Sequence, residues 1–254
     1  MNNLLQLHPE DQRIFKRNFT VRYSEVNKFG TIKLQSVFDY LQQAAAEHAN
    51  SLGFGMNSLY DKGIIWVLSK MNIKFFGSFS PEQKITVCTY PSGVERIFFR
   101  REFEIFDSST NEVLVRASSF WLLLDAAKLR PLRRNILDGV QLENPDLPAF
   151  VENPQMTDDY ELQEILQTKV LFSQMDINQH LNNAQYAAIT ENALYEKLQK
   201  EFSFETISVA FLQAQKYPDE ITTSLAVREN GDFKLVGENR VLDTACFNAC
   251  GKIR

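Results

Sequence analysis

Cysteine and histidine are scarce in this sequence, with three of each among 254 residues. Cys88, Cys246 and Cys250 are odd in number and scattered, which argues against a disulfide framework and favours a reducing compartment. The spacing of Cys246 and Cys250 would suit a metal, but no third cysteine or histidine lies near them in the sequence. Since no glycine-rich nucleotide loop occurs either, we expect neither a metal nor a cofactor.

Long hydrophobic runs are also lacking. The longest, such as residues 120–124, fall far short of the roughly 20 apolar residues that a membrane span needs. The first 19 residues have neither the basic start and apolar stretch of a signal peptide nor the composition of a transit peptide. We therefore expect a globular, cytoplasmic protein without stable membrane insertion.

The net charge of -5 conceals an asymmetry between the two halves. Residues 1–140 contain 18 basic and 14 acidic side chains, whereas residues 141–254 contain 9 basic and 18 acidic ones. An acidic partner would therefore be attracted to the first half. Nucleic acid is not expected as a partner, because the overall balance is acidic and the basic residues are not interleaved with aromatic ones.

The first half shows one long helical pattern among strand patterns. Apolar residues recur every three or four positions from Leu34 to about Leu52 and predict a helix. Other apolar segments predict strands at residues 19–24, 65–68, 73–76, 85–89, 98–106 and 113–124. Short connections, including a turn predicted from Pro91 to Gly93, favour an antiparallel sheet packed on one helix, which is an α+β arrangement.

The second half repeats the first. An offset of 149 residues aligns Val26 with Met175, and a later offset of 136 aligns Phe75 with Phe211. The order of strand, helix and strands is the same in both halves, which indicates a duplication. The sequence thus predicts two like domains, each with a long central helix on an antiparallel sheet, at residues 1–140 and 164–254. An acidic, proline-containing linker is predicted at residues 141–163.

Three polar residues of the second half, Asp176, Asn178 and His180, alternate just ahead of a predicted helix. In an extended segment, residues two apart point to the same side, so a carboxylate, an amide and an imidazole would share one space. Asn182 and Asn183 are suited to cap the helix, whose N-terminal amides favour developing negative charge. The pattern therefore makes these three residues candidates for catalysis.

The first half has Asn27, Phe29 and Thr31 at the matching positions. Only the second copy therefore carries titratable groups suited to catalysis. A structural alternative stays open, since Asp176 and Asn178 are also residue types that favour turns and helix caps.

Residues 176–183, DINQHLNN, resemble the Asp-x-Asn-x-His-x-Asn-Asn signature of the bacterial fatty acyl-acyl carrier protein thioesterases, which consist of two tandem hotdog domains. Four segments of the first half look like the same family, and the resemblance covers nearly the whole chain. These segments are Trp66 to Ser69, Val87 to Pro91, Arg100 to Phe103 and Ser119 to Asp125. The resemblance implies an α+β fold of two tandem hotdog domains.

The resemblance also implies hydrolysis of the thioester that joins a fatty acyl chain to acyl carrier protein, with Asp176, Asn178 and His180 as the catalytic set. Asn178 and amides of the helix start would polarise the carbonyl, and Asp176 or His180 would activate water. One position departs from the family, which often has a glutamate where this chain has Ala214. The carboxylate role would then fall to Asp176, or the activity would be altered.

The densest basic run, residues 128–134, follows the last strand of the first half and contains Arg130, Arg133 and Arg134. It is either a solvated loop or a docking site for the acidic acyl carrier protein, helped by Arg96, Arg100 or Arg101. The acyl chain is expected in an apolar slot between the helix and the sheet of the first domain.

Two other functions stay open at this point. The same fold could act on coenzyme A thioesters, or Ala214 could mark a non-catalytic acyl-binding protein. A homodimer is possible, although two tandem domains could already satisfy the pairing that single hotdog domains obtain by dimerising.

Overall fold

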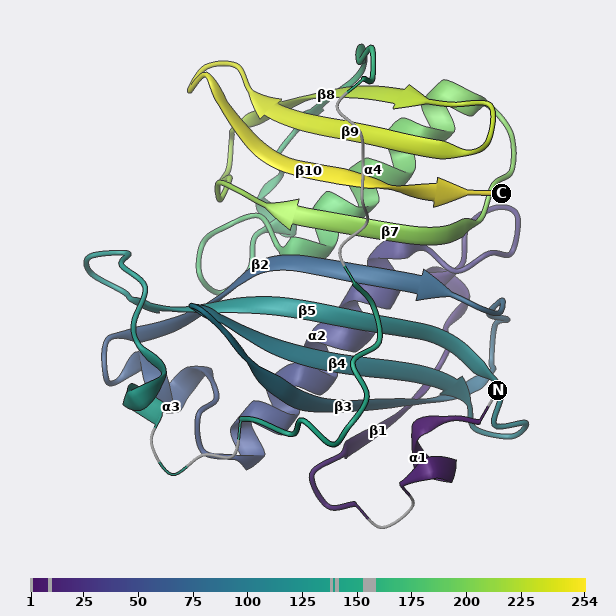
Figure 1. The fold of residues 1–254 in the computed structure, drawn as a ribbon. Helices are drawn as coiled ribbons and strands as arrows, with labels where there is room; N and C mark the ends of the chain where they lie inside the picture. Colours follow the sequence, from purple (N-terminus) through teal and green to yellow (C-terminus); the bar gives the residue numbers. More distant parts are fainter. Residues whose placement is uncertain (1, 9–10, 138, 140–141, 153–158) are drawn as a thin grey trace. The chain divides into compact units, whose positions relative to one another are not determined.

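The computed structural model describes the chain except for residues 1, 9–10, 138, 140–141 and 153–158 (Figure 1). The chain forms two compact units, each built from two segments. Unit 1 comprises Met1–Tyr23 and Asp39–Glu152, and unit 2 comprises Ser24–Phe38 and Asn153–Arg254. The domain limits at residues 140 and 164 stay a prediction.

Unit 1 contains five antiparallel strands in the order β1-β3-β4-β5-β2. They are β1 (Phe15–Thr20), β2 (Ile64–Phe75), β3 (Lys84–Glu95), β4 (Phe98–Asp107) and β5 (Val113–Asp125). The helix predicted from Leu34 to about Leu52 is confirmed as α2 (Leu34–Ser51), and the short helices α1 (Leu4–Leu7) and α3 (Met56–Tyr60) flank it in sequence.

Three sequence-based details of this unit are wrong. The two strands predicted at residues 65–68 and 73–76 are one strand, β2, whose register shifts between Leu68 and Lys70. The strand predicted at residues 19–24 ends at Thr20, where a short 3-10 helix soon follows. The turn predicted at Pro91 lies inside β3; β1 pairs with β3 only as far as Thr89, so the proline leaves no hydrogen bond to β1 unmade.

The part of α2 that belongs to unit 1 packs on one face of this sheet. His48 of α2 is buried, stacks on Phe15 of β1 with ring centroids 5.3 Å apart, and bonds Arg101 of β4 at 3.0 Å between ring Nδ1 and Nη1. Burial and the nearby guanidinium lower the pKa of His48 to about 3, so the imidazole is neutral. His48 is therefore a core residue, as its place on an apolar stripe suggests.

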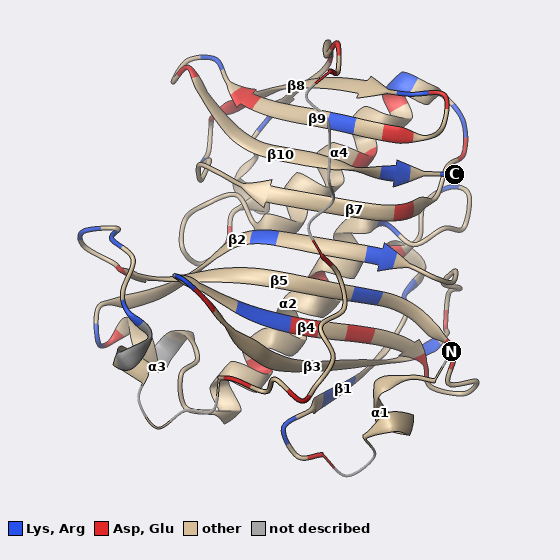
Figure 2. Cartoon of the chain, viewed as in Figure 1, with Lys and Arg blue, Asp and Glu red and all other residues tan. Residues whose placement is uncertain are grey.

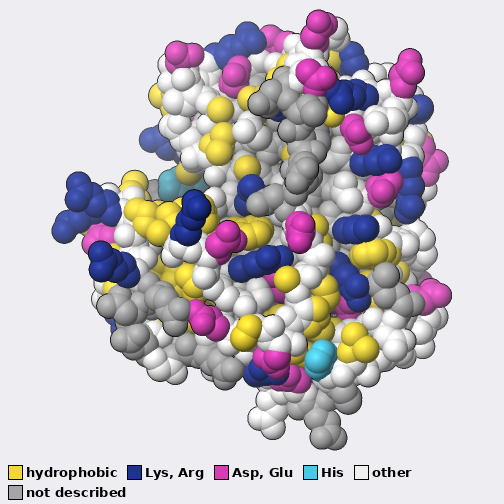
Figure 3. Space-filling view, viewed as in Figure 1, with side chains coloured by type: hydrophobic (Ala, Val, Ile, Leu, Met, Phe, Trp, Pro, Cys, Tyr) yellow, Lys and Arg dark blue, Asp and Glu magenta, His cyan; other side chains and the backbone are white. Residues whose placement is uncertain are grey.

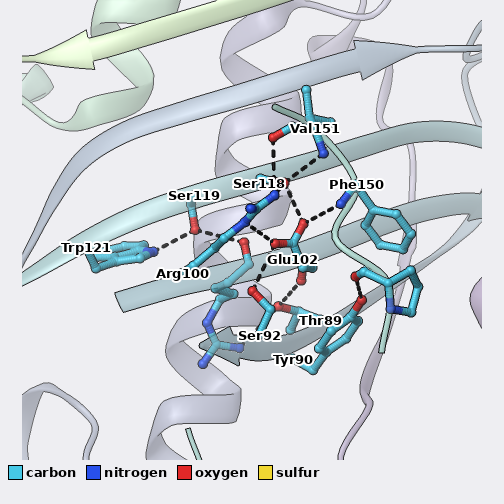
Figure 4. Close-up of polar contacts among 12 residues, drawn as sticks. Thr89, Tyr90, Ser92, Arg100, Glu102, Ser118, Ser119, Trp121, Phe150 and Val151 are labelled. Carbon is cyan, nitrogen blue, oxygen red and sulfur yellow. Dashed lines mark hydrogen bonds and ion pairs between the residues drawn. The ribbon is translucent and has the colours of Figure 1, made fainter. Parts of the chain in front are cut away.

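The opposite face of the sheet is covered by the segment that follows β5 and by α1. The carboxylate of Glu102, fully buried on β4, accepts hydrogen bonds from Arg100 Nε at 2.6 Å and from the Phe150 backbone N–H at 2.9 Å (Figure 4). Glu104, two residues on, accepts from the Leu4 backbone N–H of α1 and from Arg116. Alternate residues of one strand thus hold two distant segments against the sheet.

Unit 2 has the corresponding sheet, in the order β7-β10-β9-β8-β6. Its strands are β6 (Gln163–Lys169), β7 (Phe204–Phe211), β8 (Glu220–Val227), β9 (Asp232–Asn239) and β10 (Thr244–Ile253). The helix α4 (Asn183–Leu198) packs on this sheet, where the Tyr186 ring lies edge-on to Phe211 at 5.6 Å and to Phe247 at 5.1 Å. The predicted α+β class, with a long helix on an antiparallel sheet in each half, is confirmed.

The internal repeat is visible in the local structure. Short 3-10 helices occur at Tyr23–Glu25 and Phe172–Gln174, and isolated β-bridges follow at the same offset, one joining Val26 to Ile32 and one joining Met175 to Leu181. The helices α2 and α4 then begin at residues 34 and 183. Each half therefore enters its long helix through the same turn.

Among the residues that the structure describes, no helix combines the length and the apolar character of a transmembrane span. The same described residues contain no group of three or more histidine, cysteine, aspartate or glutamate side chains arranged to hold a metal ion.

Candidate active site

The three candidate catalytic residues lie in a tight turn between the second 3-10 helix and α4. The Asp176 carboxylate closes this turn, because its Oδ1 accepts the backbone N–H groups of Asn178 at 2.8 Å and His180 at 3.3 Å. The other carboxylate oxygen, Oδ2, lies 3.4 Å from the Asn178 amide nitrogen. The structure thus brings the carboxylate and the amide together, while His180 meets Asp176 through its backbone N–H.

The extended conformation expected for this segment is wrong. The Asp176 N–H donates to the His180 carbonyl at 2.7 Å, and the Gln179 N–H donates to the Asp176 carbonyl at 3.0 Å, so the chain reverses direction here. Gln179 has a φ of 63°, in the left-handed region. The turn forms because a short carboxylate can accept two backbone N–H groups at once, which an extended strand would not allow.

The turn leads directly into α4. Asn182 is the N-cap, and its side-chain oxygen accepts the Ala184 N–H at 2.8 Å, as predicted from the two consecutive asparagines. The candidate residues therefore lie within a few residues of a helix N-terminus, whose partial positive charge favours an anion. Asn178 and His180 are exposed and Asp176 is half-buried, so water and a substrate can reach all three.

A second loop, between β7 and β8, holds the turn in place. The Leu181 N–H donates to the Gln215 carbonyl at 2.7 Å, and the Gln215 N–H donates to the Tyr186 hydroxyl at 3.2 Å. The buried Gln215 side chain accepts from the Asn239 amide at 2.7 Å. Burial raises the pKa of the Tyr186 hydroxyl far above its ordinary value, so this group stays a neutral hydrogen-bonding partner.

No pattern in the sequence singles out Tyr186 or Asn239 as supports of the turn. Both contact Gln215, and no short spacing connects the three residues. Ala214, the position where a glutamate was expected by resemblance, is exposed beside Gln215. The loop therefore reaches the candidate turn, but it brings an amide and backbone groups there instead of a carboxylate.

The first half contains the same turn without the titratable groups. Asn27 Oδ1 accepts the N–H groups of Phe29 at 3.0 Å and Thr31 at 3.2 Å, and Gly30 has a φ of 81° where the second copy has Gln179. Thus Asn27 does for the first turn what Asp176 does for the second. Comparison of the two turns shows that closing the turn needs a side-chain oxygen and does not need a negative charge.

Glu191 of α4 is the other carboxylate of unit 2 that contacts such a turn. Its Oε2 accepts the N–H of Leu34, the first residue of α2, at 2.9 Å, and its Oε1 lies 3.4 Å from the Asn27 amide nitrogen. Burial raises the pKa of Glu191, and the two hydrogen bonds only partly oppose that shift. Glu191 therefore caps α2 and holds the first turn.

The basic run after β5 is exposed where its side chains are described. Arg130 and Arg133 point to solvent, and Arg134 begins a short 3-10 helix, Arg134–Leu137. Blue segments mark lysine and arginine in this loop in Figure 2. Of the arginines suggested as helpers, Arg96 is exposed. Arg101 is only 7% exposed, and Arg100 is bonded to Glu102, so neither of these two lies open to a large partner.

Two of the three cysteines, Cys88 and Cys246, are unsuited to act as nucleophiles. All three are free thiols, and Cys88 and Cys246 are buried. Burial raises the pKa of Cys88 to about 12 and that of Cys246 to about 11, so both thiols stay protonated at neutral pH.

Comparison with known proteins gives a consistent result. A family model described as the acyl-ACP thioesterase N-terminal domain matches residues 12–139, and one described as the acyl-ACP thioesterase C-terminal domain matches residues 157–241. Among curated proteins, an acyl-[acyl-carrier-protein] hydrolase of Cuphea viscosissima is 30% identical over 194 residues, which is 70% of this chain and 46% of the relative. An oleoyl-acyl carrier protein thioesterase of Coriandrum sativum is 25% identical over 91% of this chain and 68% of its own length. The chain thus spans about half the length of some relatives that it matches.

Solved structures show the same fold. An acyl-ACP thioesterase from Bacteroides thetaiotaomicron superposes with a TM-score of 0.84 at 20% identity, covering 96% of this chain and 99% of that one. A 12:0-ACP thioesterase from Umbellularia californica gives a TM-score of 0.75 at 18% identity, covering 95% and 97%. At these identities the likeness establishes the architecture only.

Proposed function

Because this chain belongs to the acyl-ACP thioesterase family, we propose that it hydrolyses the thioester of fatty acyl-acyl carrier protein to free fatty acid and carrier protein, in fatty acid biosynthesis. The observation that carries the proposal is the Asp176 carboxylate, held within reach of the Asn178 amide at the entrance to α4. The names of the relatives, which describe hydrolases and thioesterases of acyl carrier protein, support the same reaction.

In the proposed reaction, water attacks the thioester carbonyl carbon, a carbon–oxygen bond forms and the carbon–sulfur bond breaks. Asp176 or His180 takes the proton of the attacking water, and the leaving thiolate takes up a proton. The amide of Asn178 donates to the oxygen that becomes negative, and the partial positive charge at the start of α4 favours that negative charge. These steps need no second carboxylate, which is consistent with an alanine, Ala214, at the position where the family often has a glutamate.

The held geometry of Asp176 favours an orienting as well as a basic role. Two backbone N–H groups fix one carboxylate oxygen, and the second oxygen lies beside the Asn178 amide. A carboxylate fixed in this way needs no rearrangement before it accepts a hydrogen bond from the attacking water. His180, more exposed and on the same turn, is the alternative base.

For the substrate, we assign the carrier protein to the basic run with Arg130, Arg133 and Arg134, and the acyl chain to an apolar slot between the helix and the sheet of the first domain. The basic charge of residues 1–140 favours an acidic protein carrier. A cytoplasmic location and a homodimer belong to the same proposal; several relatives are named as chloroplastic. Sedimentation of the purified chain would settle the oligomeric state.

Coenzyme A thioesters are the second candidate substrates, because the reacting bond is the same. Matched acyl groups on the carrier protein and on coenzyme A should be compared by thiol release, with free fatty acid measured in parallel. We expect kcat/KM to be higher for the carrier-bound substrate. Equal values would favour coenzyme A, and acyl binding without thiol release would leave a non-catalytic acyl-binding protein.

A further inference from the structure

Large apolar side chains are exposed at one end of the sheet of unit 2. Phe172 is 81% exposed, Ile177 80% and Val241 89%. Four further residues of the same loops are at least half exposed, namely Leu171, Leu212, Tyr217 and Leu242. In Figure 3, yellow hydrophobic side chains reach the surface of this unit near its β9–β10 hairpin. Exposed apolar residues gathered in this way indicate an interaction surface.

The strand register places all of these residues at the same end of the sheet. Lys169 at the end of β6 pairs with Glu220 at the start of β8, and Asn239 at the end of β9 pairs with Thr244 at the start of β10. Phe211 at the end of β7 pairs with Phe247, the fourth residue of β10. The loops at residues 170–182, 212–219 and 240–243 therefore extend from one edge of the unit.

These three loops are tied to one another. Gln215 connects them, because its carbonyl accepts from Leu181 at 2.7 Å and its side chain accepts from Asn239 at 2.7 Å. The Tyr217 N–H also lies 3.3 Å from the Met175 sulfur. The exposed residues thus lie on loops that are bonded to one another, and we name the exposed side of these loops the loop-tip surface.

Four backbone N–H groups of the tips are bonded from within the tips. Asp176 accepts the N–H groups of Asn178 and His180, and Asn239 Oδ1 accepts those of Val241 and Leu242 at 3.1 Å each. A turn whose N–H groups are bonded to its own side chain loses little when water is removed. These bonds therefore lower the cost of moving the four N–H groups out of water.

The charge of the loop-tip surface does not match an acidic protein. Lys216 and Arg240 are its basic residues, against Asp176, Asp219 and Asp243, and Arg240 is already paired with Glu164 at 2.6 Å. The apolar tips are also separated by polar residues, so they do not form the continuous apolar area of a protein interface. Separated apolar tips between polar groups suit the headgroup region of a bilayer.

We propose that the loop-tip surface binds reversibly to the surface of a phospholipid bilayer, with Phe172, Ile177, Val241 and Leu242 inserted among the lipids. The proposal rests on this surface and not on the proposed hydrolysis. If both hold, the turn that carries Asp176 lies beside the bilayer, and an insoluble fatty acid product is released next to the phase that dissolves it.

Flotation with phosphatidylcholine vesicles tests this binding. We expect the wild-type chain to float with the vesicles at both low and high salt, because apolar contacts are not screened. The double variant Val241→Ser/Leu242→Ser and the variant Phe172→Ser should each partition about tenfold less, since each removes a large apolar side chain from the lipid. Leu162→Ser is the matched control, because Leu162 is 37% exposed and lies just before β6, at the opposite end of the sheet.

The depth of insertion gives a second measurement that does not depend on affinity. Tryptophan is introduced as Phe172→Trp or, for comparison, Leu162→Trp, and brominated lipids serve as quenchers. Quenching should exceed that of the wild-type Trp66 and Trp121 only for Phe172→Trp. The melting temperatures of the serine variants are measured beforehand, so that weaker vesicle binding cannot be attributed to unfolding.

Several outcomes would overturn the proposal. They are absence of flotation, equal flotation of all variants, and equal quenching at positions 172 and 162. A dimer in sedimentation that the Val241→Ser/Leu242→Ser variant dissociates, without vesicle binding, would assign the surface to a second copy. Loss of carrier-protein binding in that variant, again without vesicle binding, would assign it to the carrier.

Discussion

Asn27 and Asp176 occupy the same position of the same turn, 149 residues apart in the chain. Each side chain accepts two backbone N–H groups through one oxygen, and each turn continues into a long helix. An amide is therefore sufficient for the structural task. The negative charge of Asp176 is therefore not needed to close the turn. A charge without a structural need is the strongest indication in this turn that Asp176 has a chemical role.

Asp176→Asn is the sharpest test of that role, because it gives the second turn the side chain of the first. The turn should be kept, and melting should change by only a few degrees, while kcat for acyl carrier protein thioesters falls about 10²–10⁴-fold. Asn27→Asp is the matched control and should leave kcat unchanged. Normal turnover of Asp176→Asn would show that the carboxylate is not the base and would leave that role to His180.

Asn178→Ala should affect the reaction differently from a loss of substrate binding. If the amide donates to the developing oxyanion, kcat falls about 10²–10³-fold while KM changes little. Steady-state kinetics on the carrier-bound substrate measure both constants. A rise in KM at constant kcat would instead assign Asn178 to ground-state binding.

The sequence predicts the long elements well, because their signals are local. The apolar periodicity that begins at Leu34 marks α2, and the asparagine before α4 marks its N-cap at Asn182. The turn at Asp176 is harder to predict, since its reversal depends on Gln179 in a left-handed conformation that this residue type does not signal. In the first copy, Gly30 indicates the left-handed conformation, because glycine adopts it readily. Aligning the two copies does not show that Gln179 has the same backbone conformation.

Contacts between distant segments are the other part that the sequence does not reveal. Glu102 and Phe150 are 48 residues apart, and no periodicity connects a strand residue with a backbone N–H of an irregular segment. Likewise, the position of Glu191 in its helix does not predict that its carboxylate accepts the N–H of Leu34. The sequence alone suggests that Arg100 and Arg101 are surface charges. In the structure, tertiary contacts with Glu102 and His48 hold their side chains against the fold.

Charge reversal of the basic run tests carrier docking. The triple variant Arg130→Glu/Arg133→Glu/Arg134→Glu should raise KM for carrier-bound substrate about tenfold and leave a small thioester analogue unaffected. The effect should shrink as salt is added, because exposed charges are screened. Lys200→Glu, an exposed reversal outside the run, is the control. Equal changes for both substrates would exclude docking at this site.

Glu191 should make the stability of the chain depend on pH. Burial raises its pKa in the folded state, so the folded chain keeps a proton over a range in which the unfolded chain has released it. The contribution of Glu191 to stability is therefore greatest below about pH 4.3, the ordinary glutamate value, and is lost as pH rises through the folded pKa. Glu191→Gln removes this proton, so its melting temperature relative to wild type should rise by a few degrees between acidic and neutral pH.

Thermal melts of both proteins across that pH range measure the difference. Glu196→Gln, an exposed change on the same helix, controls for the loss of a negative charge from α4. A difference between Glu191→Gln and wild type that stays constant with pH would contradict the raised pKa. If the melting temperature of Glu191→Gln relative to wild type fell toward neutral pH, the hydrogen bond from the ionised carboxylate to α2 would stabilise the chain by more than the burial of its charge costs.

Removal of the Glu102 carboxylate should be among the most destabilising single changes in unit 1. The group is fully buried and accepts hydrogen bonds from Arg100, Ser92, Ser118 and the Phe150 backbone (Figure 4). Glu102→Ala leaves the guanidinium without its partner and should lower the free energy of unfolding by about 3–5 kcal/mol. Urea unfolding of Glu102→Ala and of the exposed control Glu112→Ala, expected within about 0.5 kcal/mol of wild type, measures the effect; similar losses in the two would mean that the segment around Phe150 is held without this carboxylate.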